Sequence, residues 1–387
     1  MTAPTPPRPF GTFFYPGPTE VRPEILGAMA RPMIPHRGAE FRALFAALQP
    51  GLRTLFGTAR RVVVSTSSAT GLMEAAVRCA PPGRILALVN GAFSERFAAI
   101  AAACGRAYDE YRVAWGEVPA PAEVARRLRA ARDGGEPFAA VTVVHSETST
   151  GALADVAAIA AAARDVGART IVDGVTSVAG APFDADAWGL DFALTGSQKA
   201  LALPPGLAFG VASAALLADA ERVAARGLYL DLVEMERYAQ RDETPNTPAL
   251  PLLYALERQL GDVAREGLAA RLARHAAMAA MTHEWVERWT ARSDGALRVV
   301  APAGARASTV TAIALPAGLP AAELVRAVAA AGFVVGTGYG RLRDTTFRIG
   351  HMGDHTTDGL ARCLAACDAA LERLLAGAAR ASVAPAT

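Results

Sequence analysis

The sequence predicts an α/β protein with a mainly parallel sheet and a smaller α+β part towards its C-terminal end. Short apolar segments rich in Val, Ile and Leu alternate with alanine-rich helical segments through the first half of the chain. Near-continuous apolar strands are typical of parallel sheets that helices cover on both faces. With 387 residues, of which 52% are hydrophobic, the chain can bury a large core, and we expect two domains.

The alternation of elements can be followed in order along the chain. We expect strands over residues 61–64, 84–89, 139–144, 170–172 and 192–194, and helices between them over residues 71–79, 95–104 and 154–166. A long helical segment over about residues 251–289 follows. The pattern then changes to strands over residues 309–313, 333–335 and 346–349, helices over residues 321–331 and 357–375, and a frayed tail after Ala376. We therefore predict an N-terminal arm (1–18), a large domain (19–255) and a small C-terminal domain (256–387).

Composition narrows the classes of function. The net charge is +2 and both signs are interspersed, so no basic stripe indicates a nucleic-acid partner. No apolar segment is long enough to span a membrane, and the proline-rich start is unlike a signal peptide, so we expect a cytoplasmic protein. Cys363 and Cys367 are four residues apart in an alanine-rich segment, where filling the core stripe of a helix is favoured over a redox pair.

Lys199 is the most informative residue, because it is the only lysine among 39 lysines and arginines. A lysine amine can lose its proton and attack a carbonyl group, whereas arginine stays protonated. Small and polar residues surround Lys199 just after an apolar run that ends at Leu194, which is typical of a strand end that opens into a pocket. A Schiff base is therefore the first chemistry to consider, and a surface lysine retained by chance is the alternative.

Two further polar clusters follow predicted strands, and ligands of open α/β sheets bind at such ends. The Ser/Thr-rich run over residues 65–70 offers hydroxyls and free N–H groups suited to a phosphate, although a single such residue could simply cap the helix. Asp173 directly follows a buried strand and requires a partner such as a protonated ring nitrogen, unless it caps the next helix. An amine, an anion site and a carboxylate together match the requirements of pyridoxal phosphate (PLP).

These residues lie in motifs that resemble the class V aminotransferases of the fold-type I PLP enzymes, above all the alanine–glyoxylate and serine–glyoxylate (serine–pyruvate) group. The similarity extends over almost the whole chain and the motifs follow the family's order: Pro16-Gly17-Pro18-Thr19, His36-Arg37, Ser68-Ala69-Thr70-Gly71, Asn90-Gly91-Ala92-Phe93, Glu147-Thr148-Ser149-Thr150-Gly151, Asp173-Gly174-Val175, Gly196-Ser197-Gln198-Lys199 and Phe347-Arg348-Ile349-Gly350. The resemblance implies the fold-type I architecture, in which a mainly parallel seven-stranded sheet lies between helices.

The resemblance also implies a role for each matching residue. Lys199 would hold PLP as an aldimine and later move the substrate proton, and Asp173 would keep the ring nitrogen protonated. Arg348 would bind the substrate carboxylate, with Gly17 beside it. The other cofactor residues that the resemblance implies are Ser68, Ala69, Thr70 and Gln198 at the phosphate, Phe93 and Val175 on the two ring faces, Ser149 near the ring hydroxyl, and Thr247, which would reach the neighbouring subunit of a homodimer.

The predicted function is a PLP-dependent aminotransferase that moves an amino group from alanine or serine to glyoxylate or pyruvate by a ping-pong mechanism. A 2-aminoethylphosphonate–pyruvate transaminase is the main alternative. A PLP lyase or desulfurase is disfavoured, because desulfurases usually carry histidine where this chain has Gln198, and a cofactor-free structural protein would leave the lone lysine unexplained. Arg341 and Arg343 either favour an acidic substrate side chain or face water.

Three other patterns are weaker. The glycine-rich residues 336–340 resemble a dinucleotide loop, but Arg341 stands at the third glycine position and a strand is expected next. His351 and His355 have the spacing of metal ligands on a helix, yet Gly353 between them favours a turn, so no metal site is expected. His145 either lies above the cofactor or is a hydrogen-bonded histidine at a strand end.

Overall fold

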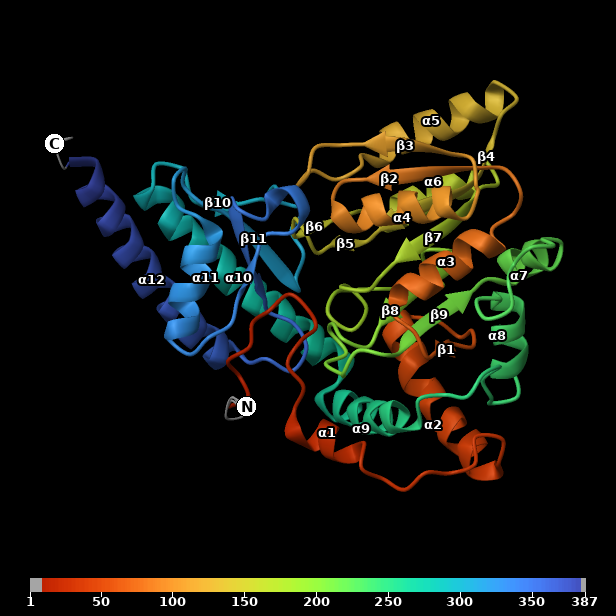
Figure 1. The fold of residues 1–387 in the computed structure, drawn as a ribbon. Coiled ribbons are helices and arrows are strands. Elements are labelled where there is room, and N and C mark those ends of the chain that lie inside the picture. Colours follow the sequence, from red (N-terminus) through yellow and green to blue (C-terminus); the bar gives the residue numbers. More distant parts are fainter. Residues whose placement is uncertain (1–8, 384–387) are drawn as a thin grey trace.

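The computed structural model describes residues 9–383, and a seven-stranded sheet forms the centre of its larger part (Figure 1). The strand order is β1-β9-β8-β7-β4-β2-β3. These strands are β1 (Val63–Ser65), β2 (Arg84–Val89), β3 (Tyr108–Arg112), β4 (Phe138–Val144), β7 (Arg169–Asp173), β8 (Phe192–Gly196) and β9 (Ala208–Ala212).

The pairs from β3 to β8 are parallel, and β9 is antiparallel to both β8 and β1. Every residue of β1, β8 and β9 is buried, as expected for strands covered on both faces. The predicted α/β class with a mainly parallel seven-stranded sheet is therefore confirmed. Since β9 reverses direction, β1 and β8 still end at the same edge as β2, β4 and β7.

Helices surround this sheet (Figure 1). Helix α3 packs on β8 and β9, α4 on β2 and β4, and α6 on β7 and β4. The helices of this part are α1 (Pro23–Ala28), α2 (Ala39–Phe56), α3 (Ala69–Cys79), α4 (Ala92–Ala103), α5 (Pro121–Asp133), α6 (Val156–Arg164), α7 (Ala214–Glu221), α8 (Leu232–Ala239) and α9 (Leu250–Glu266). A short hairpin of β5 (Ser146–Glu147) and β6 (Ala152–Leu153) follows β4.

The C-terminal part has its own antiparallel sheet, in the order β10-β11-β13-β12. Its elements are α10 (Leu268–Arg292), β10 (Arg298–Val299), β11 (Val310–Ala314), α11 (Ala321–Ala330), β12 (Gly336–Thr337), the 3-10 helix η1 (Gly340–Leu342), β13 (Thr346–Gly350) and α12 (Thr357–Val383). A separate apolar core joins them and contains Cys363 and Cys367, as predicted for these two residues. The domain boundaries at residues 18 and 255 stay predictions.

Several predicted elements differ from the observed ones. The long helix over residues 251–289 is two helices, α9 and α10, because Gly267 adopts a positive φ of 82° and its N–H donates back to Val263. The strand over residues 333–335 contributes only a bridge from Val334 to Phe13, and regular pairing begins at β12. The tail after Ala376 does not fray at once, because its alanines continue α12 to Val383.

Other elements have no counterpart in the prediction, notably β3 and β9. The sequence of β3 is polar and its residues are only partly buried, as expected at the edge of a sheet, so no apolar run marks this strand. Between residues 9 and 383, no helix combines the length and the apolar character needed to cross a membrane.

Candidate active site

A cavity of about 470 Å³ lies at the edge of the sheet where β1, β2, β7 and β8 end. This edge is where open α/β sheets bind ligands, because several loops converge there. Segments far apart in the sequence supply its walls. The residues predicted from the sequence that line it are Gly17, Ser68, Ala69, Thr70, Phe93, Asp173, Val175, Gln198 and Lys199.

Lys199 lies in the loop after β8, and its side chain is buried at the cavity. Its Nζ donates a hydrogen bond to the carbonyl oxygen of Pro16 at 2.5 Å. Burial lowers the pKa of Lys199 to about 7, the positive charge of Arg348 lowers it as well, and the carboxylate of Asp173 opposes them. A substantial fraction of the amine is therefore neutral at neutral pH and able to attack a carbonyl carbon.

Asp173 is the last residue of β7 and faces the same cavity. Its Oδ1 accepts the backbone N–H of Val175 at 2.8 Å. Burial raises the pKa of Asp173 to about 6, and this hydrogen bond acts in the opposite direction. At neutral pH the carboxylate is thus mostly ionised in a buried setting, which favours a cationic partner such as a protonated ring nitrogen.

The N-terminus of α3 faces the cavity through Ser68, Ala69 and Thr70. Ser68 is the N-cap residue, yet its side chain makes no capping hydrogen bond. The first N–H groups of a helix lack partners within the helix and carry a partial positive charge. This end of α3, together with the nearby Gln198, therefore offers hydrogen-bond donors for an anion.

Phe93 forms one wall and is fixed by a buried carboxylate. The backbone N–H groups of Phe93 and Ser94 donate to Glu147 Oε2 at 3.2 and 3.0 Å, and the hydroxyl of Ser149 donates to Glu147 Oε1 at 2.6 Å. The ring of Phe93 in turn stacks on Tyr339, with centroids 5.3 Å apart. Ser149 is thus hydrogen-bonded to Glu147. It is not one of the described residues that line the cavity.

Arg348 is buried in the middle of β13. Its Nε donates to the carbonyl oxygen of Thr337 at 3.0 Å and its Nη1 to that of Thr148 at 3.1 Å. The guanidinium carbon lies 5.5 Å from the ring centroid of Tyr339, a residue that lines the cavity. Arg348 is therefore adjacent to the cavity and held by β12 and the β5–β6 turn.

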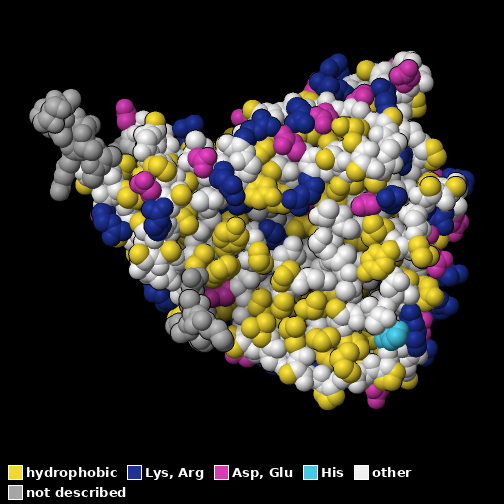
Figure 2. Space-filling model, in the orientation of Figure 1, with side chains coloured by type: hydrophobic (Ala, Val, Ile, Leu, Met, Phe, Trp, Pro, Cys, Tyr) yellow, Lys and Arg dark blue, Asp and Glu magenta, His cyan; other side chains and the backbone are white. Residues whose placement is uncertain are grey.

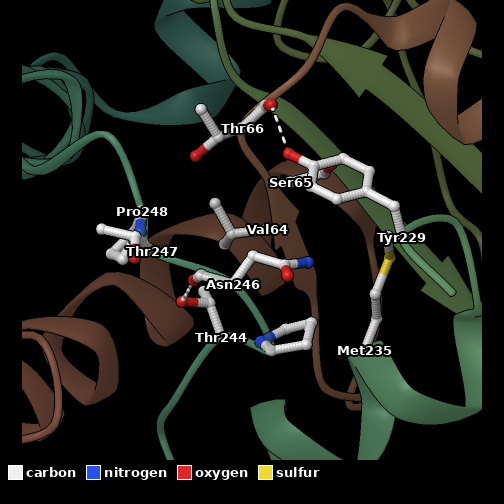
Figure 3. Close-up of a pocket in the computed structure, with 10 residues that line it drawn as sticks. Val64, Ser65, Thr66, Tyr229, Met235, Thr244, Asn246, Thr247 and Pro248 are labelled. Carbon is white, nitrogen blue, oxygen red and sulfur yellow. Dashed lines mark hydrogen bonds between the residues drawn. The ribbon is translucent and has the colours of Figure 1, made fainter.

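Thr247 lies at a different place in the single chain. It lines a small pocket of about 20 Å³ together with Ser65, Thr66 and Tyr229 (Figure 3). The Tyr229 hydroxyl donates to the carbonyl oxygen of Thr66 at 2.9 Å, and the Thr66 hydroxyl accepts the N–H of Ala249 at 3.1 Å. The structure therefore does not bring Thr247 to Lys199 of the same chain.

The histidines singled out in the sequence have structural partners. His145 packs edge-on against Trp188, its Nδ1 lies 2.9 Å from the Ser177 hydroxyl, and burial lowers its pKa to about 4. His351 bonds to the Thr311 hydroxyl at 2.8 Å, and His355 to the carbonyl oxygen of Phe13 at 3.0 Å. No group of three His, Cys, Asp or Glu side chains within residues 9–383 is arranged to hold a metal ion.

Five residues of the cavity wall were not among the site residues predicted from the sequence: Pro18, Met73, Arg96, Pro205 and Tyr339. Arg96 lies one helical turn after Phe93 on α4, a spacing that places both side chains on one face. Tyr339 belongs to the glycine-rich residues 336–340, which form β12 and lead into η1 before β13 begins. The glycine-rich segment therefore contributes to the cavity wall through Tyr339.

Comparison with known proteins gives the family. The model of the class-V aminotransferases matches residues 23–340. The chain belongs to this family. A serine–glyoxylate aminotransferase of Methylorubrum extorquens is 33% identical to it, over 88% of this chain and 86% of that protein. Among solved structures, an aspartate aminotransferase of subgroup IV from Thermus thermophilus is 35% identical with a TM-score of 0.83, covering 94% of this chain and 99% of that one.

An alanine–glyoxylate aminotransferase from Nostoc sp. is 29% identical with a TM-score of 0.86, covering 96% of this chain and 97% of that one. The fold is therefore that of the fold-type I PLP enzymes, and this class V aminotransferase is a PLP-dependent transaminase. The cavity fits the cofactor, because it combines an amine for an aldehyde, a carboxylate for a ring nitrogen and a helix N-terminus for a phosphate.

Proposed function

We propose that this aminotransferase moves the amino group of alanine or serine to glyoxylate or pyruvate by a ping-pong mechanism, in which both substrates use one cavity in turn. The observation that carries the proposal is the buried amine of Lys199, which shares a cavity with Asp173 and the N-terminus of α3. The names of the relatives support a small amino donor and a glyoxylate acceptor, although one structural neighbour is named as an aspartate aminotransferase.

Different residues around the cavity would bind different parts of the cofactor. PLP, when bound, supplies an electron-accepting ring that stabilises negative charge at the substrate α-carbon. Ser68, Ala69, Thr70 and Gln198 would hold its phosphate, Asp173 its ring nitrogen, and Phe93 and Val175 its two faces, with Ser149 acting through Glu147.

Lys199 and Arg348 would act on the substrate. The Lys199 amine would hold the cofactor's aldehyde carbon and, once released, would move a proton from the substrate α-carbon to that cofactor carbon, and in the opposite direction in the second half-reaction. A pKa of about 7 suits both directions of this transfer at neutral pH. Arg348 would bind the α-carboxylate, and Gly17 would leave space for it beside Lys199, since a Cβ at Gly17 would lie 2.2 Å from the Nζ.

We also propose that the protein is a cytoplasmic homodimer in which Thr247 reaches the phosphate site of the neighbouring subunit. Leu26 and Met33 are large exposed hydrophobic side chains, and hydrophobic side chains gather over the lower half of the face in Figure 2. Such a surface supports self-association. Sedimentation equilibrium would measure it, and Thr247→Val should weaken PLP binding only if the dimer forms.

The test of the proposed function uses the holoenzyme and the variant Lys199→Arg. A panel of donors (L-alanine, L-serine, L-aspartate and 2-aminoethylphosphonate) is assayed against glyoxylate, pyruvate and 2-oxoglutarate. We expect parallel double-reciprocal plots with L-alanine or L-serine as donor, and loss of turnover in Lys199→Arg, because guanidinium keeps the charge but cannot join the aldehyde. Converging plots, or substantial turnover in the variant, would refute the mechanism, and a preference for 2-aminoethylphosphonate would favour the alternative transaminase.

A further inference from the structure

Arg96 projects a positive charge at the cavity from α4. It is partly buried, and its guanidinium carbon lies 4.9 Å from the ring centroid of Phe93. Its Nη2 donates a hydrogen bond of 3.3 Å to the hydroxyl of Tyr339. This distance is long for a hydrogen bond, so a stronger acceptor in the cavity could replace the phenol oxygen without breaking a tight contact.

No carboxylate in the described part of the chain forms an ion pair with Arg96. The neighbouring Glu95 is already engaged, since its Oε1 lies 2.9 Å from Arg112 and 2.5 Å from Arg341. Arg341 also lies over the ring of Trp115, 4.5 Å from its centroid. The sequence raised Arg341 and Arg343 for an acidic substrate side chain, but both are exposed and neither lines the cavity, whereas Arg96 does.

The positive charge of Arg96 acts on the ionisable groups of the cavity. The pKa of Lys199 is lowered mainly by burial and by Arg348, and Arg96 acts in the same direction. The pKa of Asp173 is raised by burial, and Arg96 opposes this shift. Arg96 therefore lies close enough to the reacting region for its charge to act on groups bound there.

Tyr339 contacts two guanidinium groups. Arg348 lies near its ring, 5.5 Å from the centroid, and Arg96 donates to its hydroxyl. The proposed function assigns the α-carboxylate of the substrate to Arg348 and the cofactor phosphate to the N-terminus of α3. One cation at the cavity, that of Arg96, is then left without an anionic partner.

We propose that Arg96 binds the second acidic group of a substrate, so that this site accepts dicarboxylic amino acids and dicarboxylic 2-oxo acids in addition to small neutral ones. The inference rests on the proposed function, because it takes Arg348 as the site of the α-carboxylate. A planar guanidinium binds a carboxylate through two parallel hydrogen bonds, which gives discrimination against an uncharged side chain of the same size.

A binding experiment tests this assignment without turnover. Succinate and butyrate have the same number of carbon atoms, but only succinate carries a second carboxylate. Isothermal titration of the PLP-loaded enzyme should show succinate binding about 10- to 100-fold more tightly, the range of one charge-assisted hydrogen-bonded pair. Arg96→Gln should abolish this preference, Arg96→Lys should keep part of it, and the matched control Arg343→Gln should keep all of it.

A kinetic experiment on the same variants adds a second measurement. The ratio of kcat/KM for L-aspartate to kcat/KM for L-alanine should fall about 10- to 100-fold in Arg96→Gln and stay unchanged in Arg343→Gln. Because the ratio is compared, any effect of Arg96 on Lys199 that is common to both donors cancels.

Three results would overturn the assignment: equal affinities for succinate and butyrate in the wild type, a preference that persists in Arg96→Gln, or purification of that variant without PLP, which would place Arg96 at the cofactor instead. The proposed function fails separately. If neither L-alanine nor L-serine changes the cofactor absorbance while the succinate preference depends on Arg96, then the donor assignment is wrong and the acidic subsite is retained.

Discussion

Lys199 and Pro16 are joined by a hydrogen bond of 2.5 Å from the amine to the backbone carbonyl oxygen, although 183 residues separate them. Two further bonds hold the same segments together. The N–H of Thr19 donates to the carbonyl oxygen of Gln198 at 2.9 Å, and its hydroxyl to that of Lys199 at 3.1 Å. Residues 16–19 therefore form a fixed wall of the cavity beside the reactive amine.

Gly17→Ala should remove activity, because a methyl group on Gly17 would overlap the side chain of Lys199. Gly17 has a positive φ of 113°, and a Cβ there would lie 2.2 Å from the Nζ of Lys199. A displacement of about 1 Å at a reacting group can cost about a hundredfold in rate, so we expect at least that loss in kcat/KM together with weaker PLP binding. Visible absorbance of the bound cofactor and initial rates measure the two effects.

Gly27→Ala is the matched control, since a Cβ at Gly27 meets no atom within 4 Å. This variant should keep both its PLP and its rate. Full activity in Gly17→Ala would mean that residues 16–19 can move away from Lys199, contrary to the hydrogen bonds described above.

The parts of the site that could be predicted are those whose chemistry is rare in this chain. Lys199 is the only lysine, and Asp173 directly follows an apolar strand, so each could be recognised from local sequence. Arg96 could not be recognised in this way, because arginine is abundant in the chain. Only the folded structure shows that Arg96 lines the cavity and that the neighbouring Glu95 pairs with other arginines.

The same distinction applies to the fold. Buried apolar strands such as β2 match their predicted bounds, whereas the polar edge strand β3 acquires its structure from pairing with β2. The break at Gly267 was missed because an isolated glycine is tolerated in a helix, and only its conformation in the folded chain ends α9. Contacts between distant segments, and not local pattern, decide these features.

The pH dependence of cofactor binding should report the pKa of Lys199. Only the neutral amine attacks an aldehyde, and this form is populated above the pKa. The rate at which apoenzyme gains visible absorbance after mixing with PLP should therefore rise with pH and level off above about 7, whereas an ordinary lysine with a pKa of 10.5 would keep gaining rate to much higher pH.

The variant Arg348→Met tests the cause of the lowered pKa of Lys199. The positive charge of Arg348 helps to lower the pKa of Lys199, so its removal should move the midpoint to higher pH. Arg343→Met removes an exposed arginine outside the cavity and should leave the midpoint in place. Comparing the variants removes the ionisation of PLP itself, which is the same in all three, and identical midpoints for all three would contradict the assigned cause.

Asp173→Asn should reduce turnover by about a hundredfold or more while the protein stays folded. An amide cannot offset the charge of a protonated ring nitrogen, so the ring would become a weaker electron acceptor. Steady-state rates measure this loss, and the exposed Asp133→Asn is the control. Unchanged turnover in Asp173→Asn would remove the carboxylate from the proposed mechanism and leave it the local role of binding the N–H of Val175.

Glu147→Gln should lower the free energy of unfolding and loosen the packing around the bound cofactor, because this one buried carboxylate accepts hydrogen bonds from several donors. It accepts the N–H groups of Phe93, Ser94 and Ser149 and the hydroxyls of the two serines. A glutamine amide would turn an NH₂ group toward some of these donors and would remove a negative charge from the N-terminus of α4. We expect the free energy of unfolding to fall by about 1–3 kcal/mol, the usual cost of unsatisfied buried polar groups.

Urea unfolding measures that loss, and circular dichroism of the bound PLP reports whether Phe93 still packs on the ring. Glu24→Gln is the control, since Glu24 also lies in the first turn of a helix but is exposed. It should change neither quantity. If Glu147→Gln is destabilised while the dichroism and kcat/KM stay unchanged, Glu147 stabilises the fold without positioning Phe93, whereas loss of all three places Glu147 among the residues that shape the cavity.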